Sequence, residues 1–366
     1  MNSDRGNVLE IAPAQTNNPP SESLAPITQI HHIDNDRRAW ATIGRRILRF
    51  EKGGWQEEAR FPRAFPRDCF AFYRPFARAA RADKCNVYVN AEGNLLGIRS
   101  GTVYTFQGTD SLQPLFKIQG DCVLHGGICE DNDGWSYIGE YFRNKERGPV
   151  RIWRVTEEMG DWEVAHLFPA GSVRHVHGVY RDPSDPEALW VTVGDGQDEC
   201  YLFRTGDRFR SIEQFGDGTQ TWRAVRLFFT KDWICWLTDS HISQNHACRM
   251  NRRTGELEIG QEIDCSSWYG ATTTDGLHVA FTTVEPGPAI HRNQASILTS
   301  RDGFHWEELT SFDKDFWRPM RLFKYGVLSC PSGPMKSDSF YISGEGLVGL
   351  DGSSIRISLP ASDITV

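Results

Sequence analysis

The chain has 366 residues, a mass of 41.5 kDa, a formal net charge of −8 and a sequence pI of about 5.8. Its acidic residues are scattered rather than run together, so it lacks the electrostatic footprint of a nucleic-acid-binding protein, and we expect no nucleic acid partner. No stretch approaches the roughly 18 consecutive apolar residues of a membrane-spanning helix, so we expect no membrane partner.

The N-terminal residues are polar and rich in Asn, Pro and Ser, and they lack the basic and apolar regions of a signal peptide. We therefore expect a disordered arm over residues 1–29 and one domain over residues 30–366, in a cytoplasmic protein. The nine cysteines support the same location, because they are odd in number, have no C-x-x-C spacing and mostly lie in apolar strand patterns. Such cysteines are expected to be reduced and buried.

A weak sequence repeat occurs seven times along the chain. Each copy is a short polar turn followed by a strand of mixed polar and apolar residues that ends on a large apolar residue. The closing residues are Phe61, Phe116, Phe168, Phe215, Ile263, Phe312 and Leu359. They are spaced 47 to 55 residues apart, and a period of about 40–50 residues filled with strand patterns is typical of β-propeller blades. The sequence predicts an all-β, seven-bladed β-propeller with mostly four-stranded antiparallel blades.

In chain order, the predicted blades vary in regularity. The clearest are expected at 123–168, 175–215, 223–263 and 269–312, each with four strand patterns separated by Asp, Gly or Pro turns. Less regular blades are expected at about 38–61, 68–118 and 318–360. The first is short of a strand, which either residues 27–33 or the tail 362–366 would supply, so that a terminal segment closes the ring.

Several turns between third and fourth strands resemble the S-x-D-x-G-x-x-W box of sialidase-like propellers. Ser300, Asp302, Gly303 and Trp306 match after one deletion, and the turns that begin at Thr156 and Thr205 match more loosely. The chain therefore resembles the sialidase-like, BNR-repeat superfamily over roughly residues 38–360. These boxes are structural turns on the face away from the ligand, so the resemblance supports a fold and not an activity.

Chemically active side chains gather where inner strands begin and second strands end, positions that converge on the axis of a propeller. The strand starts supply His125, His175, His177, Trp222, Arg223, Trp268, Tyr269, Trp317 and Arg318. The strand ends supply Glu140, Tyr141, Asp195, Asp239, His241 and Glu285. We expect the functional site among these residues.

His175 and His177 are two positions apart on a predicted strand, so both imidazoles lie on one side, a geometry that suits a shared metal ion. The ion would be divalent: Ca²⁺, Mn²⁺ or Zn²⁺. His125 in the neighbouring blade is geometrically able to supply a third ligand. The alternative is structural, with one histidine lining the channel and the other satisfied by backbone hydrogen bonds.

The remaining candidates also have two interpretations. Arg223 and Arg318 can each present a fixed pair of donors to a substrate carboxylate, or they can neutralise the acidic residues near the axis. Tyr141 can act as a proton donor or acceptor, or as a packing residue. Glu140, Asp195, Asp239 and Glu285 recur at the ends of second strands in four consecutive blades, so part of their recurrence can reflect blade architecture. The tryptophans suit a sugar platform or the packing of blades.

The composition of this site resembles that of the propeller polysaccharide lyases, including the oligogalacturonate and rhamnose-glucuronate types, which use axial histidines with a metal. The resemblance implies β-elimination from a uronate, with a cation or Arg223 and Arg318 neutralising the carboxylate. His175 and His177 would serve as metal ligands or base, and His125 as acid or third ligand. No dinucleotide or P-loop fingerprint is present, so we expect no nucleotide cofactor.

Other functions remain open. A glycoside hydrolase would use two of the carboxylates Glu140, Asp195, Asp239 and Glu285 as acid and as nucleophile or base. A non-catalytic propeller would bind a glycan or a protein, and a tailoring lyase or cyclase would act on a small biosynthetic intermediate. A lyase makes an unsaturated product that absorbs in the near ultraviolet, a hydrolase makes only new reducing ends, and a binding module makes neither.

Overall fold

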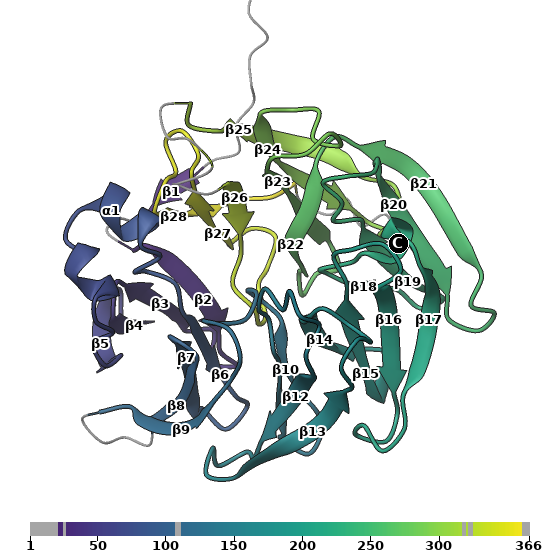
Figure 1. Cartoon of the computed structure of the whole chain (residues 1–366). Helices are drawn as coiled ribbons and strands as arrows, with labels where there is room; N and C mark the ends of the chain where they lie inside the picture. The colour runs from purple at the N-terminus through teal and green to yellow at the C-terminus, as the bar shows by residue number, and fades with distance from the viewer. Residues whose placement is uncertain (1–20, 25–26, 107–110, 317–319, 321–324, 361–366) are drawn as a thin grey trace, which may run out of the picture.

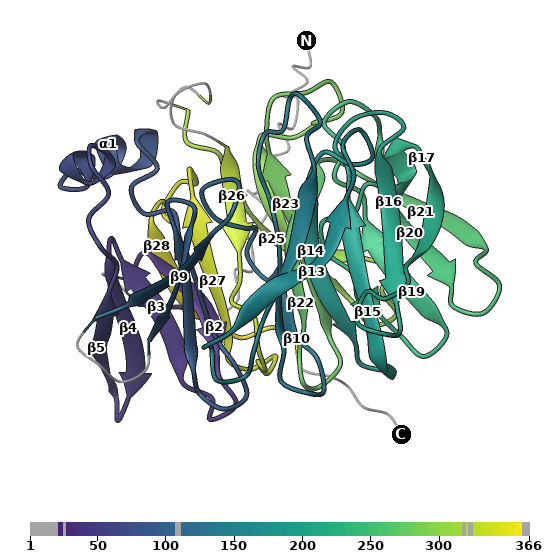
Figure 2. The ribbon, with the colours of Figure 1, turned by 60° about the horizontal axis from the view of Figure 1, so that its bottom comes forward.

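Antiparallel β-sheet forms nearly all of the regular structure. The computed structural model describes residues 21–24, 27–106, 111–316, 320 and 325–360. Figure 1 shows the sheets standing side by side around a central axis, and Figure 2 shows the same ring tilted. This is a β-propeller, so the predicted fold class is confirmed.

Five of the sheets each contain four antiparallel strands that follow one another along the chain. The first has β2 (Gln29–Ile33), β3 (Ala39–Ile43), β4 (Arg46–Glu51) and β5 (Gly54–Arg60), and the second has β6 (Asn86–Val89), β7 (Leu95–Arg99), β8 (Thr102–Phe106) and β9 (Gln113–Lys117). The third has β10 (Ile128–Glu130), β11 (Ser136–Gly139), β12 (Val150–Val155) and β13 (Trp162–Phe168). The fourth has β14 (Val176–Asp182), β15 (Asp185–Val193), β16 (Cys200–Thr205) and β17 (Glu213–Gly218), and the fifth has β18 (Phe228–Phe229), β19 (Trp233–Leu237), β20 (Asn245–Asn251) and β21 (Leu257–Ile263).

The last sheet has eight strands. They are β22 (Ser266–Thr272), β23 (His278–Val284), β24 (Gln294–Ser300), β25 (Glu307–Asp313), β26 (Gly326–Ser329), β27 (Phe340–Glu345), β28 (Ser353–Ile357) and β1 (Ser21–Ser23). Thr283 of β23 pairs with Val327 of β26, and this contact merges what the sequence predicts as two blades. The described residues therefore form six separate sheets, and the count of seven blades stays a prediction.

Burial differs between inner and outer strands in the way a ring of packed sheets requires. Every residue of the second strands β7 and β23 is buried, because a strand enclosed by neighbouring sheets needs apolar side chains on both faces. The outer strand β13 exposes most of its residues. The apolar cores lie between adjacent sheets: Tyr137 and Ile152 of the third sheet pack in one cluster with Val179 and Val191 of the fourth.

The N-terminal segment closes the ring. β1 pairs with β28, and β2 forms the innermost strand of the first sheet, so residues 27–33 supply the strand that the first blade lacked. The alternative tail, 362–366, lies outside the described residues. The arm predicted over residues 1–29 is also corrected in part, because Ser21–Ser23 and Gln29 lie in strands; residues 1–20 lie outside the described residues.

The second blade begins later than predicted. Residues 61–85, which we call the insertion, separate β5 from β6 and hold the 3-10 helix η1 (Arg67–Phe70) and the helix α1 (Arg74–Ala79). Figure 2 shows α1 standing above the edge of the sheets. A second 3-10 helix, η2 (Gln220–Trp222), precedes β18. Among the described residues, no helix is long and apolar enough to span a membrane.

The best-matching Asp box forms the expected turn between β24 and β25. The Asp302 carboxylate accepts hydrogen bonds from the backbone amides of Phe304 and His305 at 2.9 and 2.8 Å. The Trp306 indole donates to the Gly303 carbonyl at 3.1 Å. The turn beginning at Thr205 has a related network, in which the Thr205 hydroxyl accepts from backbone amides. These boxes are therefore structural turns.

Candidate active site

Two histidines and an aspartate meet near the axis. His175 directly precedes β14 and His177 lies within it, while Asp195 follows β15 after Gly194. Gly194 and Asp195 have φ values of 146° and 141°, an uncommon backbone geometry that turns the chain back toward the histidines. The two Nε2 atoms are 3.1 Å apart, and they lie 3.3 Å (His175) and 3.2 Å (His177) from the Asp195 Oδ1.

Backbone carbonyls fix which nitrogen of each ring carries hydrogen. The Nδ1 atoms of His175 and His177 lie 2.8 Å from the carbonyl oxygens of Phe142 and Ala224, respectively. Because a carbonyl oxygen can only accept, each Nδ1 must donate, which leaves both Nε2 atoms with lone pairs when the rings are neutral. Two lone pairs and a carboxylate oxygen then face one another, so the cluster needs a proton or a cation between them. Metal-binding histidines commonly show this carbonyl-anchored arrangement.

Two arginines neutralise Asp195. Arg223 lies 3.1 Å from Oδ1 and Arg174 lies 3.2 Å from Oδ2. Burial alone would raise the pKa of this carboxyl, but His175 and His177, which donate to it through Nε2 when they are protonated, and the charge of Arg223 hold the pKa well below its usual range. Asp195 is therefore ionised throughout the neutral range.

Behind this cluster lies a second group of carboxylates. Arg223 also contacts Asp239 at 3.2 Å, and Glu285 accepts a hydrogen bond from the Ser266 hydroxyl at 2.6 Å. Burial raises the pKa of Asp239 to about 7, against the charge of Arg223 and with the help of Glu285. Burial likewise raises the pKa of Glu285. Neither residue lines the pocket described next, so both act on the site through Arg223.

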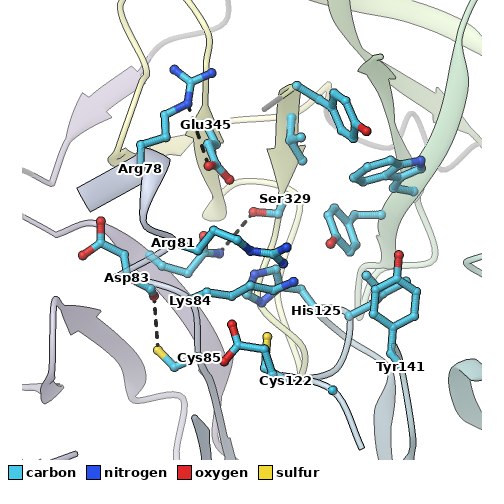
Figure 3. A pocket seen from close by; sticks show the side chains of 18 of the residues that line it. Arg78, Arg81, Asp83, Lys84, Cys85, Cys122, His125, Tyr141, Ser329 and Glu345 are labelled. Atoms are coloured by element: carbon cyan, nitrogen blue, oxygen red, sulfur yellow. Dashed lines mark hydrogen bonds and ion pairs between the residues drawn. The ribbon is translucent and has the colours of Figure 1, made fainter. Parts of the chain in front are cut away.

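The cluster borders a pocket with a volume of about 640 Å³, a size typical of small-molecule sites. Its wall includes His175 and Asp195 on one side and residues of the insertion on another. Figure 3 shows Arg81 and Lys84 reaching into this space, with His125 and Tyr141 across from them. The insertion therefore brings a basic wall to the axial site.

Three cations of the pocket wall have no acidic partner among the described residues: Arg81, Lys84 and Arg143. Other basic residues of the wall are paired, as Arg78 is with Asp315 at 2.9 Å. Unpaired guanidinium and ammonium groups around a pocket attract anions, and guanidinium binds carboxylates through two parallel hydrogen bonds. The pocket is thus suited to an acidic ligand.

His125 lines the pocket but stands apart from the other two histidines. Its ring centroid lies 5.4 Å from that of His31 and 5.6 Å from that of Tyr269. Burial, reinforced by the charge of Lys84, lowers the pKa of His125 to about 4, so the ring is neutral at pH 7. The cluster able to hold a metal is made by His175, His177 and Asp195, so Asp195 takes the place predicted for His125.

Tyr141 lies beside the cluster, with its ring centroid 4.4 Å from that of His175. Burial raises the pKa of Tyr141 above its usual value, and the negative charges of Asp195 and Asp239 raise it further. The phenol therefore keeps its proton at neutral pH and can donate a hydrogen bond into the pocket.

Other predicted residues have different surroundings. The Glu140 carboxylate accepts hydrogen bonds from the backbone amides of Gln119 and Arg151 and from the Trp153 indole, and it does not line the pocket. It therefore supports the fold rather than the site. Trp222 stacks on Trp236, with centroids 5.3 Å apart, so it packs rather than forms a platform.

The eight-stranded last sheet contributes several residues to the pocket wall, including Tyr269 of β22 and Glu345 of β27. Trp268 lines the pocket, whereas Trp317 and Arg318 lie outside the described residues. Of the more distant histidines, His241 Nδ1 lies 3.3 Å from Arg223, and exposed His291 contacts Gln244.

Sequence reasoning missed the contribution of the insertion and of Glu345 on β27. Burial raises the pKa of Glu345, and its carboxylate lies 3.9 Å from Arg78. A signal for the insertion was present, since residues 61–85 hold six basic and two acidic residues in a chain with net charge −8.

No family model matches the chain, and no curated protein matches it in sequence. Solved structures do match the chain in their three-dimensional fold. One chain of the mitotic checkpoint complex aligns at 10% identity with a TM-score of 0.56, covering 99% of this chain and 100% of that one. YCF48 bound to D1 peptide aligns at 12% identity with a TM-score of 0.53, covering 94% and 98% of the two chains.

The extracellular domain of the hybrid two-component system BT4673 from B. thetaiotaomicron aligns at 12% identity with a TM-score of 0.55. The alignment covers 96% of this chain but only 44% of that one. At such low identities these similarities show the β-propeller-type fold alone, and the relation to the sialidase-like, BNR-repeat superfamily stays a prediction.

Proposed function

We propose that the axial pocket is the active site of a carbon–oxygen lyase that acts on an acidic sugar, such as a uronate-containing oligosaccharide or a related small acid. The observation that carries this proposal is the meeting of three unpaired cations with Tyr141, His125 and the His175–Asp195 cluster in one pocket. The cations supply affinity for a carboxylate, and the other groups supply proton transfer.

The proton transfers balance with residues of this chain. Arg81, Lys84 and Arg143 hold the substrate carboxylate, which makes the α-proton more acidic. Neutral His125 accepts that proton, and the C–H electron pair becomes the new C=C bond as the β-C–O bond breaks. Tyr141 protonates the departing oxygen, and the charge of Lys84, whose Nζ lies 6.0 Å from the ring centroid, stabilises the phenolate. Both groups recover their starting states by proton exchange with water.

A divalent ion fits the His175–His177–Asp195 cluster. Bonds of about 2.0–2.2 Å in a tetrahedral site place ligand atoms roughly 3.3–3.5 Å apart, close to the observed 3.1, 3.2 and 3.3 Å. Two imidazoles suit Zn²⁺ or another transition metal better than Ca²⁺, which prefers oxygen ligands. Such an ion would act as a Lewis acid toward the substrate carboxylate.

Hydrolysis receives less support. A glycosidase needs two carboxyl groups that flank the bond to be cut. Asp239 and Glu285 have the raised pKa values expected of an acid, but they are buried behind the pocket wall. Asp195 is the one predicted carboxylate that lines the pocket, and it is already bound by two arginines.

The proposal is tested by incubating the protein with uronate-containing oligosaccharides and following absorbance in the near ultraviolet. We predict that the unsaturated product forms and that Tyr141→Phe lowers turnover by about 10²-fold or more, because the leaving oxygen loses its proton donor. His291→Ala, which changes an exposed histidine away from the pocket, is the matched control and should keep full turnover. Full turnover by Tyr141→Phe, or new reducing ends without absorbance, would overturn the lyase assignment.

A further inference from the structure

The insertion combines positive charge with exposed aromatic rings. Three phenylalanines are almost fully exposed: Phe65 at 87%, Phe72 at 80% and Phe316 at 91% of their surface. Phe70, Tyr73 and Phe76, which lie close to Phe65 and Phe72 in the sequence, are about half exposed. Phe316 belongs to the same region because its neighbour Asp315 pairs with Arg78 of α1. Grouped exposed apolar side chains of this kind mark an interaction surface.

Buried ion pairs hold these rings in place. Arg78, whose side chain has no exposed surface, pairs with Asp315, and Arg99 pairs with Asp68 in η1. Arg67, the first residue of η1, pairs at 2.7 Å with Asp121 in the segment that follows β9. The aromatic side chains therefore project from a fixed platform and not from a loose chain.

Unpaired charge accompanies the rings. Exposed Arg63, which does not line the pocket, makes no ion pair among the described residues. Together with the excess of basic residues over acidic ones in the insertion, it creates a local positive surface on an acidic protein. Apolar rings that project beside an unpaired arginine match the composition of segments that lie in a membrane interface, where rings enter the acyl boundary and cations meet phosphates.

We propose that the insertion, together with Phe316, docks the protein peripherally on a lipid surface that carries anionic headgroups. Charge complementarity and the projecting phenyl rings carry this choice together. An acidic polysaccharide would engage the arginines, but it has no apolar interior in which the projecting phenyl rings would be buried, as a lipid surface has. Peripheral docking departs from our expectation of no membrane partner, which rested on the absence of a spanning segment.

Docking would bring the pocket to the lipid surface. Ala77 and Arg78 line the pocket from α1, while Phe76 on the same short helix is half-exposed. One ring of the docking surface and part of the pocket wall thus belong to the same helix. The proposal is independent of the lyase proposal, because the lyase can act without a membrane and the docking surface can bind without turnover.

The test is sedimentation of the full chain with vesicles of phosphatidylcholine alone and of phosphatidylcholine mixed with phosphatidylglycerol. We expect binding to the mixed vesicles, weakened by salt because the headgroup contacts are electrostatic. The triple variant Phe65→Ser, Phe72→Ser, Phe316→Ser should bind at least about tenfold more weakly, since the rings no longer enter the interface. Arg63→Gln should reduce the preference for phosphatidylglycerol.

The matched control changes three exposed apolar residues of the outer strands, Val164→Ser, Leu167→Ser and Ile259→Ser, and should bind as the wild type does. Circular dichroism and melting curves of both triple variants check that they fold. Absence of vesicle binding by the wild type, equal loss in both triple variants, or binding to an acidic polysaccharide but not to vesicles would overturn the proposal. The assay measures no turnover, so its failure leaves the lyase proposal unaffected.

Discussion

Arg223 lies between two carboxylates with opposite protonation behaviour. Burial tends to raise the pKa of Asp195, but two histidines and Arg223 stabilise its charged form more strongly, so its pKa is lowered. Asp239 has a pKa raised to about 7 because burial outweighs the same arginine. The difference comes from the number of donors each carboxylate receives, since Asp239 Oδ1 is buried without a hydrogen-bond partner among the described residues.

The raised pKa of Asp239 gives a pH dependence with a defined sign. Between pH 3.8 and about 7 the folded protein keeps a proton that the unfolded chain releases, so the contribution of Asp239 to the free energy of unfolding falls as pH rises through this window. Asp239→Asn removes that titration. We expect the free energy of unfolding of the variant, relative to that of the wild type, to rise by roughly 2 kcal/mol between pH 5 and pH 8.

Denaturant unfolding of both proteins at the two pH values measures this change. Asp198→Asn, at an exposed position in the loop that follows β15, is the control and should show no relative shift. An Asp239→Asn difference from the wild type that is identical at pH 5 and pH 8 would contradict a pKa of about 7 for Asp239.

The sequence predicted part of the site because period-two spacing is local. His175 and His177 had to share one side of a strand, and Asp195 had to follow the next strand. The position of His125 depends on a loop and on packing against His31 and Tyr269, which no local pattern encodes. The predicted strand position of Glu140 was right, but the three donors to its carboxylate come from two other segments, Gln119 after β9 and Arg151 and Trp153 on β12.

At the scale of elements, the strands followed from alternating and continuous apolar patterns. The insertion did not, because α1 has only six residues and no apolar period long enough to identify a helix. The merging of two predicted blades also escaped prediction, since it depends on pairing between β23 and β26, which lie far apart in sequence.

The Asp-box turn between β24 and β25 makes a prediction about stability alone. Trp306 is buried, its ring centroid lies 5.0 Å from that of Phe228, and its backbone N–H donates a hydrogen bond to the Gln261 side-chain oxygen. Trp306→Ala should lower the free energy of unfolding by about 3–5 kcal/mol, as expected for a large buried aromatic residue. Denaturant titration measures the loss.

Metal content and ligand binding per folded molecule should stay at the wild-type level, because Trp306 belongs to a turn that does not line the pocket. A folded Trp306→Ala protein that had lost its metal would contradict the separation of the structural turns from the site.

For the molecule as a whole, β1 contributes to ring closure through three residues, beside the backbone hydrogen bonds that join Ile33 and His31 to Ser332. Ser21, Glu22 and Ser23 pair with Ile357, Arg356 and Ile355 of β28, and Glu22 also forms an ion pair with Arg356. Removing residues 1–24 should lower the free energy of unfolding by about 1–3 kcal/mol, the value of a few backbone hydrogen bonds. Thermal melting of the truncated and full chains measures the change.

The truncation spares Ile27 and Ile30, which are fully buried, so the first sheet keeps its inner strand. The site should therefore bind ligand as before. An unchanged melting temperature would show that β1 does not secure the ring.

The central claim is that His175, His177 and Asp195 form a metal centre at the wall of an acid-binding pocket. Elemental analysis of the untagged protein, and of the His175→Ala, His177→Ala double variant, tests it most directly, with His291→Ala as the control. We predict near-stoichiometric divalent transition metal in the wild type and control, and its loss from the folded double variant. Wild-type protein that stays free of metal after incubation with Zn²⁺ or Mn²⁺, or a double variant that retains the metal, would contradict the claim.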